Sequence, residues 1–130
     1  MYGNTDLKET NMSESKMLGM AKDFAVDVIN ICRTIKERQR EGLLTTQLLR
    51  SATSIGANIH ESKYGQSPQD FISKMQIALK ECYESEYWLE LLVKTNYLDS
   101  ETYKRLRNSC GAIRRMLISS INTTRSNMEK

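Results

Sequence analysis

Basic side chains near the C-terminal end are the first residues whose type and spacing indicate a chemistry. Residues 99–130 contain seven basic and three acidic residues, a local charge of +4, whereas the whole chain carries +3. Intervals of three, seven and eleven place four of them near one side of a helix: Lys104, Arg107, Arg114 and Arg125. Arg115 lies beside this row. Such a row either binds phosphate groups or is a solvated face whose positive charges balance the acidic residues Glu84, Glu86 and Glu90.

Large apolar residues between positions 83 and 91 indicate a second surface. Four of them lie off the apolar stripe that this segment would turn toward a core: Tyr83, Tyr87, Trp88 and Leu91. A helix in an isolated bundle needs only one apolar stripe, and aromatic residues are frequent at subunit contacts. We therefore expect these residues to join copies of the chain into a homo-oligomer. The alternative is that the bulky helices of a short bundle cover one another.

No combination of residues indicates a catalytic or metal site. A di-metal carboxylate site in a helical bundle needs two Glu-x-x-His pairs, and His60 is the one histidine of the chain. Cys32, Cys82 and Cys110 are far apart and fall on or beside apolar stripes, as buried thiols do. No residue is a convincing general base beside a nucleophile. We expect a protein that is not an enzyme and that uses no cofactor and no metal.

Four amphipathic helical segments must position these residues. Apolar residues recur at intervals of three and four from about Ser15 to Arg40 and from about Thr45 to Lys63, and twice more after Ser67. The string Ser67-Pro68-Gln69-Asp70 is typical of a capped helix start. Asn96 is suited to the left-handed position that ends this third helix, and Asp99 to the cap of the fourth. Gly42 is expected to end the first helix.

Amphipathic helices joined by short links predict an all-α fold, an antiparallel up-down-up-down four-helix bundle. We expect residues 1–14 to form a disordered N-terminal tail, residues 15–125 the bundle, and residues 126–130 a frayed C-terminal tail. No apolar run reaches the roughly 18 residues of a membrane span, and the N-terminal residues lack the apolar segment of a secretion signal. With three cysteines in no disulfide pattern, these features predict a cytoplasmic protein that does not contact a membrane.

Several strings in the helical segments carry a family resemblance. They are Gln47 to Ile59, Asp70-Phe71-Ile72, Ile77 to Glu81, Tyr87 to Leu92, and Tyr97-Leu98. Together they resemble the ribosomal-RNA intervening-sequence proteins, also called the four-helix-bundle protein family, over about residues 17–124. The resemblance implies a bacterial cytosolic four-helix bundle that assembles into rings of five and has no established biochemical activity. A distant relative, the accessory protein of diversity-generating retroelements, is similar in fold and binds nucleic acid and a reverse transcriptase.

The resemblance also covers four polar residues of the second helical segment: Gln47, Arg50, Asn58 and Glu61. Asn58 and Glu61 either contact a ligand or a partner, or form hydrogen bonds between helices, and we favour the second interpretation. His60 and Ser62 depart from the small residues that the family more often carries there.

These observations predict a non-enzymatic, oligomeric protein, a nucleic-acid-associated scaffold that binds phosphates through the basic flank of the fourth helix. The expected partners are further copies of the chain, in the five-membered ring that the resemblance implies, together with RNA or DNA. The alternative is a protein-binding adaptor, or a structural assembly protein, that makes no contact with nucleic acid.

Overall fold

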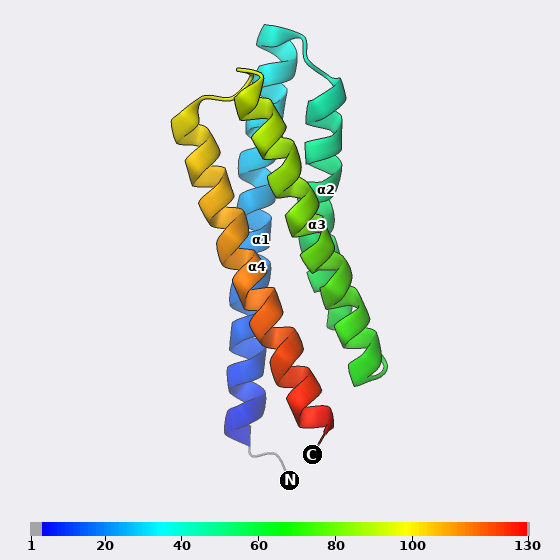
Figure 1. Ribbon diagram of the computed structural model, residues 1–130. Helices are drawn as coiled ribbons and strands as arrows, with labels where there is room; N and C mark the ends of the chain where they lie inside the picture. The colour runs from blue at the N-terminus through cyan, green and yellow to red at the C-terminus, as the bar shows by residue number, and fades with distance from the viewer. Residues whose placement is uncertain (1–3, 130) are drawn as a thin grey trace.

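A computed structural model describes the backbone of residues 4–129 and the side chains of residues 12–129 (Figure 1). The described chain contains four helices: α1 (Asn4–Gln39), α2 (Leu43–Ser62), α3 (Pro68–Lys94) and α4 (Ser100–Met128). No strand occurs between residues 4 and 129, so the predicted all-α class is confirmed. None of the described helices is both long enough and apolar enough to cross a membrane.

Each helix packs against two others, in the cyclic order α1, α2, α3, α4 and back to α1. Figure 1 shows the helices running alternately in opposite directions along a shared axis. Only a few residues separate one helix from the next, which is the usual length for connections between antiparallel helices. These contacts are consistent with the predicted up-down-up-down bundle.

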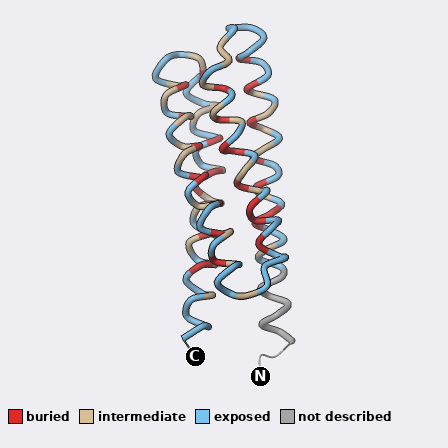
Figure 2. Tube along the Cα trace, turned by 90° about the vertical axis from the view of Figure 1, so that its right-hand side faces the viewer, coloured by how far each residue is buried: buried red, intermediate tan, exposed pale blue. Residues whose placement is uncertain are grey.

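The apolar stripes of the four helices face inward and form one core. Figure 2 shows the buried positions on the inner side of each helix. Phe24 of α1, Ile55 of α2, Leu89 of α3 and Ile113 of α4 are among its largest fully buried side chains. Burial of one such side chain is worth about 1.5–3 kcal/mol, so the apolar stripe of each helix favours turning that face toward the core.

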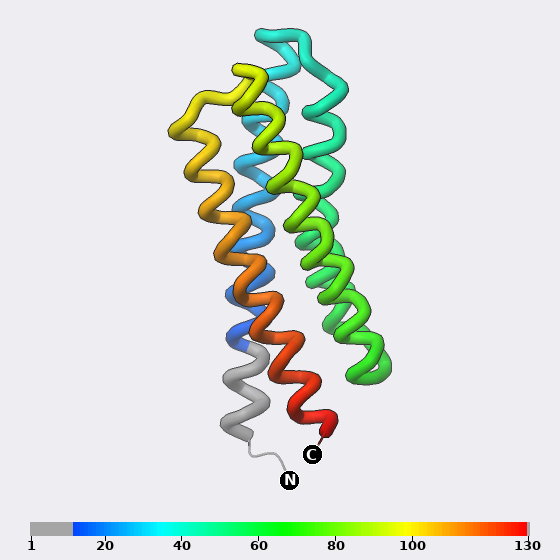
Figure 3. Tube along the Cα trace, viewed as in Figure 1, coloured from blue at the N-terminus to red at the C-terminus, as the bar shows by residue number. Residues whose placement is uncertain are grey.

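The loop between α2 and α3 lies at the same end of the bundle as the end of α4 (Figure 3). Both ends of the helical region extend beyond the predicted bounds. α4 ends at Met128, three residues beyond the predicted 125, and α1 begins at Asn4 rather than at Ser15. Among the side chains that the structure describes, Met17 is the first buried core residue of α1. The tails expected over residues 1–14 and 126–130 stay predictions, and residues 1–3 and 130 lie outside the described residues.

The predicted ends of α3 and the predicted start of α4 are confirmed by their caps. The Ser67 hydroxyl accepts a hydrogen bond from the Asp70 backbone N–H at 3.1 Å. The Asp99 carboxylate accepts one from the Thr102 N–H at 2.7 Å. Asn96 follows α3 with a φ of 66°, the left-handed conformation predicted for it. These caps set the short turns that bring α2, α3 and α4 side by side.

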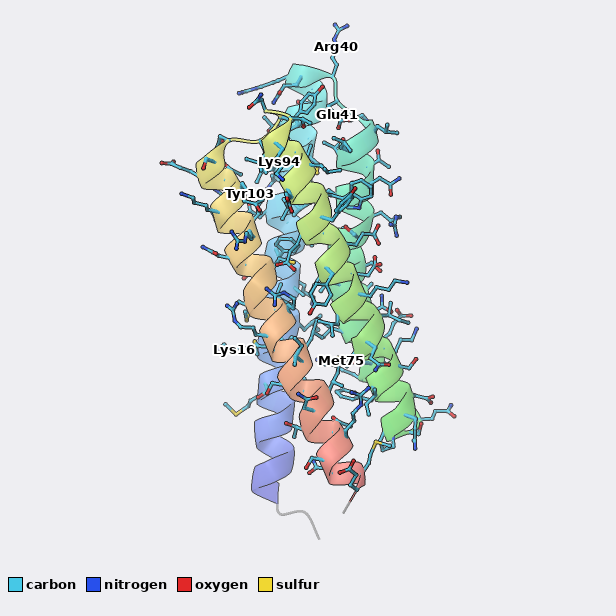
Figure 4. The ribbon with its side chains drawn as sticks, in the orientation of Figure 1. Lys16, Arg40, Glu41, Met75, Lys94 and Tyr103 are labelled. Carbon is cyan, nitrogen blue, oxygen red and sulfur yellow. The ribbon has the colours of Figure 1, made fainter. Side chains whose placement is uncertain are left out.

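The connection between α1 and α2 differs from the prediction, because Gly42 does not end α1. Arg40 takes the left-handed conformation, with a φ of 55°, and its side chain projects from the end of the bundle (Figure 4). Gly42 instead precedes α2 and has no side chain with which to cap it. The neighbouring Glu41 carboxylate supplies the cap, accepting hydrogen bonds from the N–H groups of Leu44 at 2.9 Å and Thr45 at 3.0 Å.

Gly56 of α2 packs against Ala21 of α1. A β-carbon placed on Gly56 would lie 3.5 Å from the β-carbon of Ala21. Because 3.5 Å is an ordinary van der Waals contact, the small residues of α2 bring the two helices together without a kink at this position, within a helix that runs unbroken from Leu43 to Ser62.

Candidate nucleic-acid interface

The outer surface of α4 carries a row of unpaired basic side chains. Its members are exposed, and none forms an ion pair with a residue that the structure describes: Lys104, Arg107, Arg115 and Arg125. We call these four residues the basic row. They extend over about 32 Å at 1.5 Å per residue. Glu101 is the one acidic residue within α4, so this surface holds a clear excess of positive charge.

Arg114, which the sequence analysis places in the same row, has a different environment. Its guanidinium donates hydrogen bonds to both carboxylate oxygens of Glu86 on α3, at 3.1 and 3.3 Å. These bonds raise the pKa of Arg114 above its ordinary value. Arg105 is held in a similar way by Asp27 of α1, at 2.9 and 3.1 Å. Arg114 and Arg105 therefore tie α4 to α3 and α1, whereas the basic row forms no ion pair within the described chain.

Gly111 brings two guanidinium groups together in the middle of this surface. A β-carbon at Gly111 would lie 3.3 Å from Nη1 of Arg115 and 3.4 Å from Nη2 of Arg114. Both guanidinium groups therefore lie over Gly111, where the helix carries no side chain. Neighbouring guanidinium donors of this kind are suited to a phosphate oxygen.

The three acidic residues that were considered as partners for the basic charges of the fourth helix form ion pairs with three different residues. Glu86 pairs with Arg114 of α4, Glu84 with Arg50 of α2, and Glu90 with Lys94 of its own helix. The hydrogen bond and the charge of Lys94 lower the pKa of Glu90, with a smaller contribution from Arg107. Figure 4 shows Lys94 close to the level of Tyr103 on α4. One carboxylate of the three reaches α4, and it meets Arg114 rather than the basic row.

The aromatic residues of α3 divide into an exposed and a half-buried pair. Tyr83 and Tyr87 are 54% and 55% exposed, and we call these two residues the aromatic surface. Trp88 and Leu91 are half-buried. Trp88 Nε1 donates a hydrogen bond to Glu84 at 3.2 Å, and its ring meets the Tyr87 ring nearly edge-on, with centroids 5.0 Å apart. Trp88, one of the four residues predicted at a subunit contact, is therefore anchored within the chain.

A polar cluster between α2 and α3 was not anticipated from the sequence. Arg50 donates a hydrogen bond to Glu84, and its Nη1 lies 3.8 Å from Oε2 of Glu81. Glu81 is only 8% exposed, and its Oε2 has no hydrogen-bond partner in the described chain. Burial, followed by the charge of Glu84, raises the pKa of Glu81. The one sequence signal was the position of Glu81 beside the apolar stripe residue Cys82.

The other polar residues covered by the family resemblance make contacts within the bundle. Asn58 is buried, and its amide donates hydrogen bonds to the Ser54 carbonyl at 2.9 Å and hydroxyl at 3.1 Å. Glu61 is exposed and lies 3.8 Å from Lys74 of α3, while Gln47 is half-buried. The Asn58 bonds lie within α2, and the Glu61 contact is an ion pair with α3, so hydrogen bonding of these two residues between helices stays a prediction.

The three cysteines are free and buried, and they do not meet at one point. The Cys110 thiol donates a hydrogen bond to the Cys82 carbonyl at 3.5 Å, whereas the Cys32 thiol donates to Thr45 at 3.7 Å. Burial, with the charge of Glu41, raises the pKa of Cys32 to about 11. The hydrogen bond to Cys82 and burial also raise the pKa of Cys110. Within residues 12–129 no cluster of histidine, cysteine and acidic residues could hold a metal ion.

One open depression, of about 410 Å³, lies beside the turn between α2 and α3. Its lining includes Glu61, Tyr64, Asp70 and Lys74. His60, which is exposed, meets the Tyr64 ring edge-on near this turn, with centroids 5.6 Å apart. The depression contains none of the basic row and none of the aromatic surface.

Comparison with known proteins gives the chain a family. The family model described as "23S rRNA-intervening sequence protein" matches residues 13–119. Among curated proteins, no match was found. The chain is similar to a crystal structure of a protein with unknown function from the S23 ribosomal protein family of Bacteroides thetaiotaomicron. That similarity has 43% identity and a TM-score of 0.83, and covers 85% of this chain and 98% of the other. The chain therefore belongs to the 23S rRNA-intervening sequence protein family.

Proposed function

We propose that the protein is a non-enzymatic scaffold that associates with RNA and contacts its phosphate groups through the basic row. One observation carries the proposal: four exposed cations of α4 have no ion-pair partner in the described chain, although Arg105 and Arg114 beside them are paired. The family description refers to a sequence within ribosomal RNA, and for this reason the proposal names RNA before DNA. The buried, unreactive thiols agree with a cytoplasmic location, which we also propose.

The chemistry of the basic row supports backbone binding rather than sequence reading. Lysine and arginine side chains that meet phosphates release counterions, so affinity falls as salt rises. Such contacts position a protein on nucleic acid without reading its bases. We therefore expect binding that varies little with RNA sequence and that weakens steeply with added salt.

Fluorescence anisotropy of a labelled RNA, titrated at several KCl concentrations, tests this proposal. Four phosphate contacts to a single strand predict a slope of about −3 in a plot of log K against log salt. Replacing Arg107 and Arg115 together by Gln should reduce the slope by about 1.4 and weaken binding at low salt. Arg114 is left in place because its loss would disturb the contact with Glu86.

Lys22 and Arg33 of α1 offer a matched control. Both are exposed, and changing them to Gln removes the same amount of charge from another helix. The control should keep the slope of the parent. Equal losses in the two variants would show general charge attraction rather than a site, and a parent that binds neither RNA nor DNA at low salt would refute the proposal.

The second candidate function is assembly, or docking of another protein, through α3. The exposure of Tyr83 and Tyr87, 54% and 55%, is the observation that favours it. We propose that copies form a homo-oligomer, with the five-membered ring that the resemblance implies, in which one surface of each subunit meets a different surface of the next. Light scattering tests it: the mass of one 15.0 kDa chain at micromolar concentration contradicts the oligomer.

A further inference from the structure

The aromatic surface lies beside the basic row rather than on a separate side of the molecule. The hydrogen bonds between Arg114 and Glu86 hold α3 and α4 together at this level. The same Arg114 places its guanidinium carbon 5.6 Å from the centre of the Tyr83 ring. Because Arg114 and Arg115 both lie over Gly111, a continuous path leads from the basic row to Tyr83.

Both tyrosine rings are held by neighbours and still present a large open area. Arg114 lies over one face of Tyr83, and the ring is nevertheless 54% exposed. The Tyr87 ring, 55% exposed, rests edge-on against Trp88, which is itself anchored to Glu84. Tyr83 and Tyr87 are four residues apart on α3, so they lie on the same side of the helix with a rise of about 6 Å between them.

Exposed aromatic rings beside a cationic groove have a known chemical use in proteins that bind single strands. Bases stack on the rings while basic side chains follow the phosphates, and the stacking accepts any base because every base has a flat face. In a duplex, the stacking of neighbouring base pairs already occupies these faces. A surface of this kind therefore favours unpaired nucleotides over double-stranded ones.

We infer that the protein binds single-stranded RNA, with bases stacked on Tyr83 and Tyr87 and phosphates on the basic row. The inference rests on the proposed function, and it adds the kind of RNA and the residues that select it. Charge complementarity supports the choice of occupant: Arg114, which lies over Tyr83, shares the surface around Gly111 with Arg115. Arg107 and Arg115 are exposed, and neither forms an ion pair within the described chain. A second copy of the chain on the same rings is the competing occupant.

The test compares a labelled single-stranded RNA with an RNA hairpin of equal length and with single-stranded DNA. Replacing Tyr83 and Tyr87 by Leu keeps apolar volume and removes the rings. This pair should lose about 30-fold or more in affinity for the single strand, since each stacked base contributes about fivefold or more. Affinity for the hairpin, closed by a structured tetraloop so that few bases are free to stack, should change by less than about twofold. Replacing both residues by Phe keeps the rings and should preserve binding.

Trp88 gives a second readout, because it is the single tryptophan of the chain and touches Tyr87. Single-stranded RNA should change the Trp88 fluorescence of the parent and of the Phe pair, and should leave that of the Leu pair unchanged. Circular dichroism melts and light scattering of each variant show whether fold and assembly are retained.

The outcomes separate this inference from the proposed function. If the Leu pair binds the single strand like the parent, while the Arg107 and Arg115 variant loses affinity, the basic row stands and the stacking inference is wrong. If the Leu pair breaks into smaller species, the rings join copies of the chain, and the inference is also wrong. Binding to single-stranded DNA alone contradicts the assignment to RNA. A parent that binds no nucleic acid refutes both.

Discussion

α3 packs against α2 on one side and against α4 on the other, and an arginine–glutamate pair joins each contact. Between α3 and α4, Arg114 holds Glu86 by two hydrogen bonds, at 3.1 and 3.3 Å, so one cation meets one anion. Between α2 and α3, Arg50 faces both Glu84 and the buried Glu81. The same residue types thus leave an excess of positive charge outside α4 and an excess of acidic groups inside the α2–α3 contact.

The difference shows that the position of a charge decides what the charge can do. The surplus cations of α4 are exposed, so water solvates them and a phosphate can reach them. The surplus carboxyl of Glu81 is out of reach of solvent, and burial raises its pKa instead. A count of charges along the sequence treats these two regions alike, although the surplus charge of one is exposed and that of the other is buried.

The largest expected effect comes from breaking the core beneath the α3–α4 contact. Ile113 of α4 is fully buried, and Ile113→Asp places an unpaired charge there, at a cost of more than about 3 kcal/mol. We expect loss of the cooperative thermal transition in circular dichroism. Ser119→Asp, at an exposed position of the same helix, should melt like the parent. If Ile113→Asp also melts like the parent, the assigned core face of α4 is wrong.

Double-mutant cycles compare the two arginine–glutamate pairs directly. Glu86→Gln leaves Arg114 without its carboxylate partner, and the coupling energy of this pair should be about 1 kcal/mol. The coupling of Arg50 with Glu84 should be smaller, because Arg50 keeps Glu81 nearby when Glu84 is removed. Urea unfolding measures both cycles, and unchanged m-values confirm that the compared states are the same. A larger coupling energy for Arg50 with Glu84 than for Arg114 with Glu86 would contradict this ranking.

The two buried serines at the α2–α3 contact are expected to differ. The Ser85 hydroxyl donates to the Ser51 hydroxyl at 2.9 Å, and the Ser51 hydroxyl donates to the Leu48 carbonyl at 3.1 Å. Ser51→Ala leaves the buried Ser85 hydroxyl without its acceptor and should cost about 1 kcal/mol. Ser85→Ala leaves the bond to Leu48 in place and should cost less. Thermal melts of the two single variants and of the double variant measure which substitution costs more stability. Equal costs for Ser51→Ala and Ser85→Ala would contradict this prediction.

The smallest expected effect is a pH-dependent gain from Glu81→Gln. The pKa of Glu81 in the folded protein is raised above 4.5, so the folded state holds this proton more tightly than the unfolded chain does. The resulting stability is complete below pH 4.5 and is lost as pH rises through the folded pKa.

Because Gln stays neutral at every pH, Glu81→Gln should melt higher than the parent at pH 7, by roughly 2 °C. The gain should disappear below pH 4.5, where the parent carboxyl is protonated in both states. Melting temperatures between pH 4 and pH 8 measure it, and the exposed Glu61→Gln serves as control. A gain that grows as pH falls would have the opposite sign and would contradict the raised pKa.

By itself the sequence determined the helices, their inward faces and most of their ends. The caps at Ser67 and Asp99 and the left-handed Asn96 involve residues only a few positions apart, and apolar spacing is likewise a property of one helix. The ends that differ from the prediction are the start of α1, the end of α4 and the turn at Arg40, where the Glu41 side chain caps α2. Gly42 was suited to end α1, and only the path of the connection between α1 and α2 showed that Arg40 takes the left-handed conformation instead.

Only the tertiary structure decided which charged residues are paired, free or buried. Arg114 and Glu86 are 28 positions apart, and Arg50 and Glu84 are 34 apart, so each pair depends on how one helix is rotated and shifted against another. The periodicity of α4 places Arg107 and Arg114 in one row, yet Arg114 reaches across to α3 and Arg107 stays free. Packing between helices sets rotation and shift, because side chains must interlock in a close-packed core, and spacing along a single helix does not contain that information.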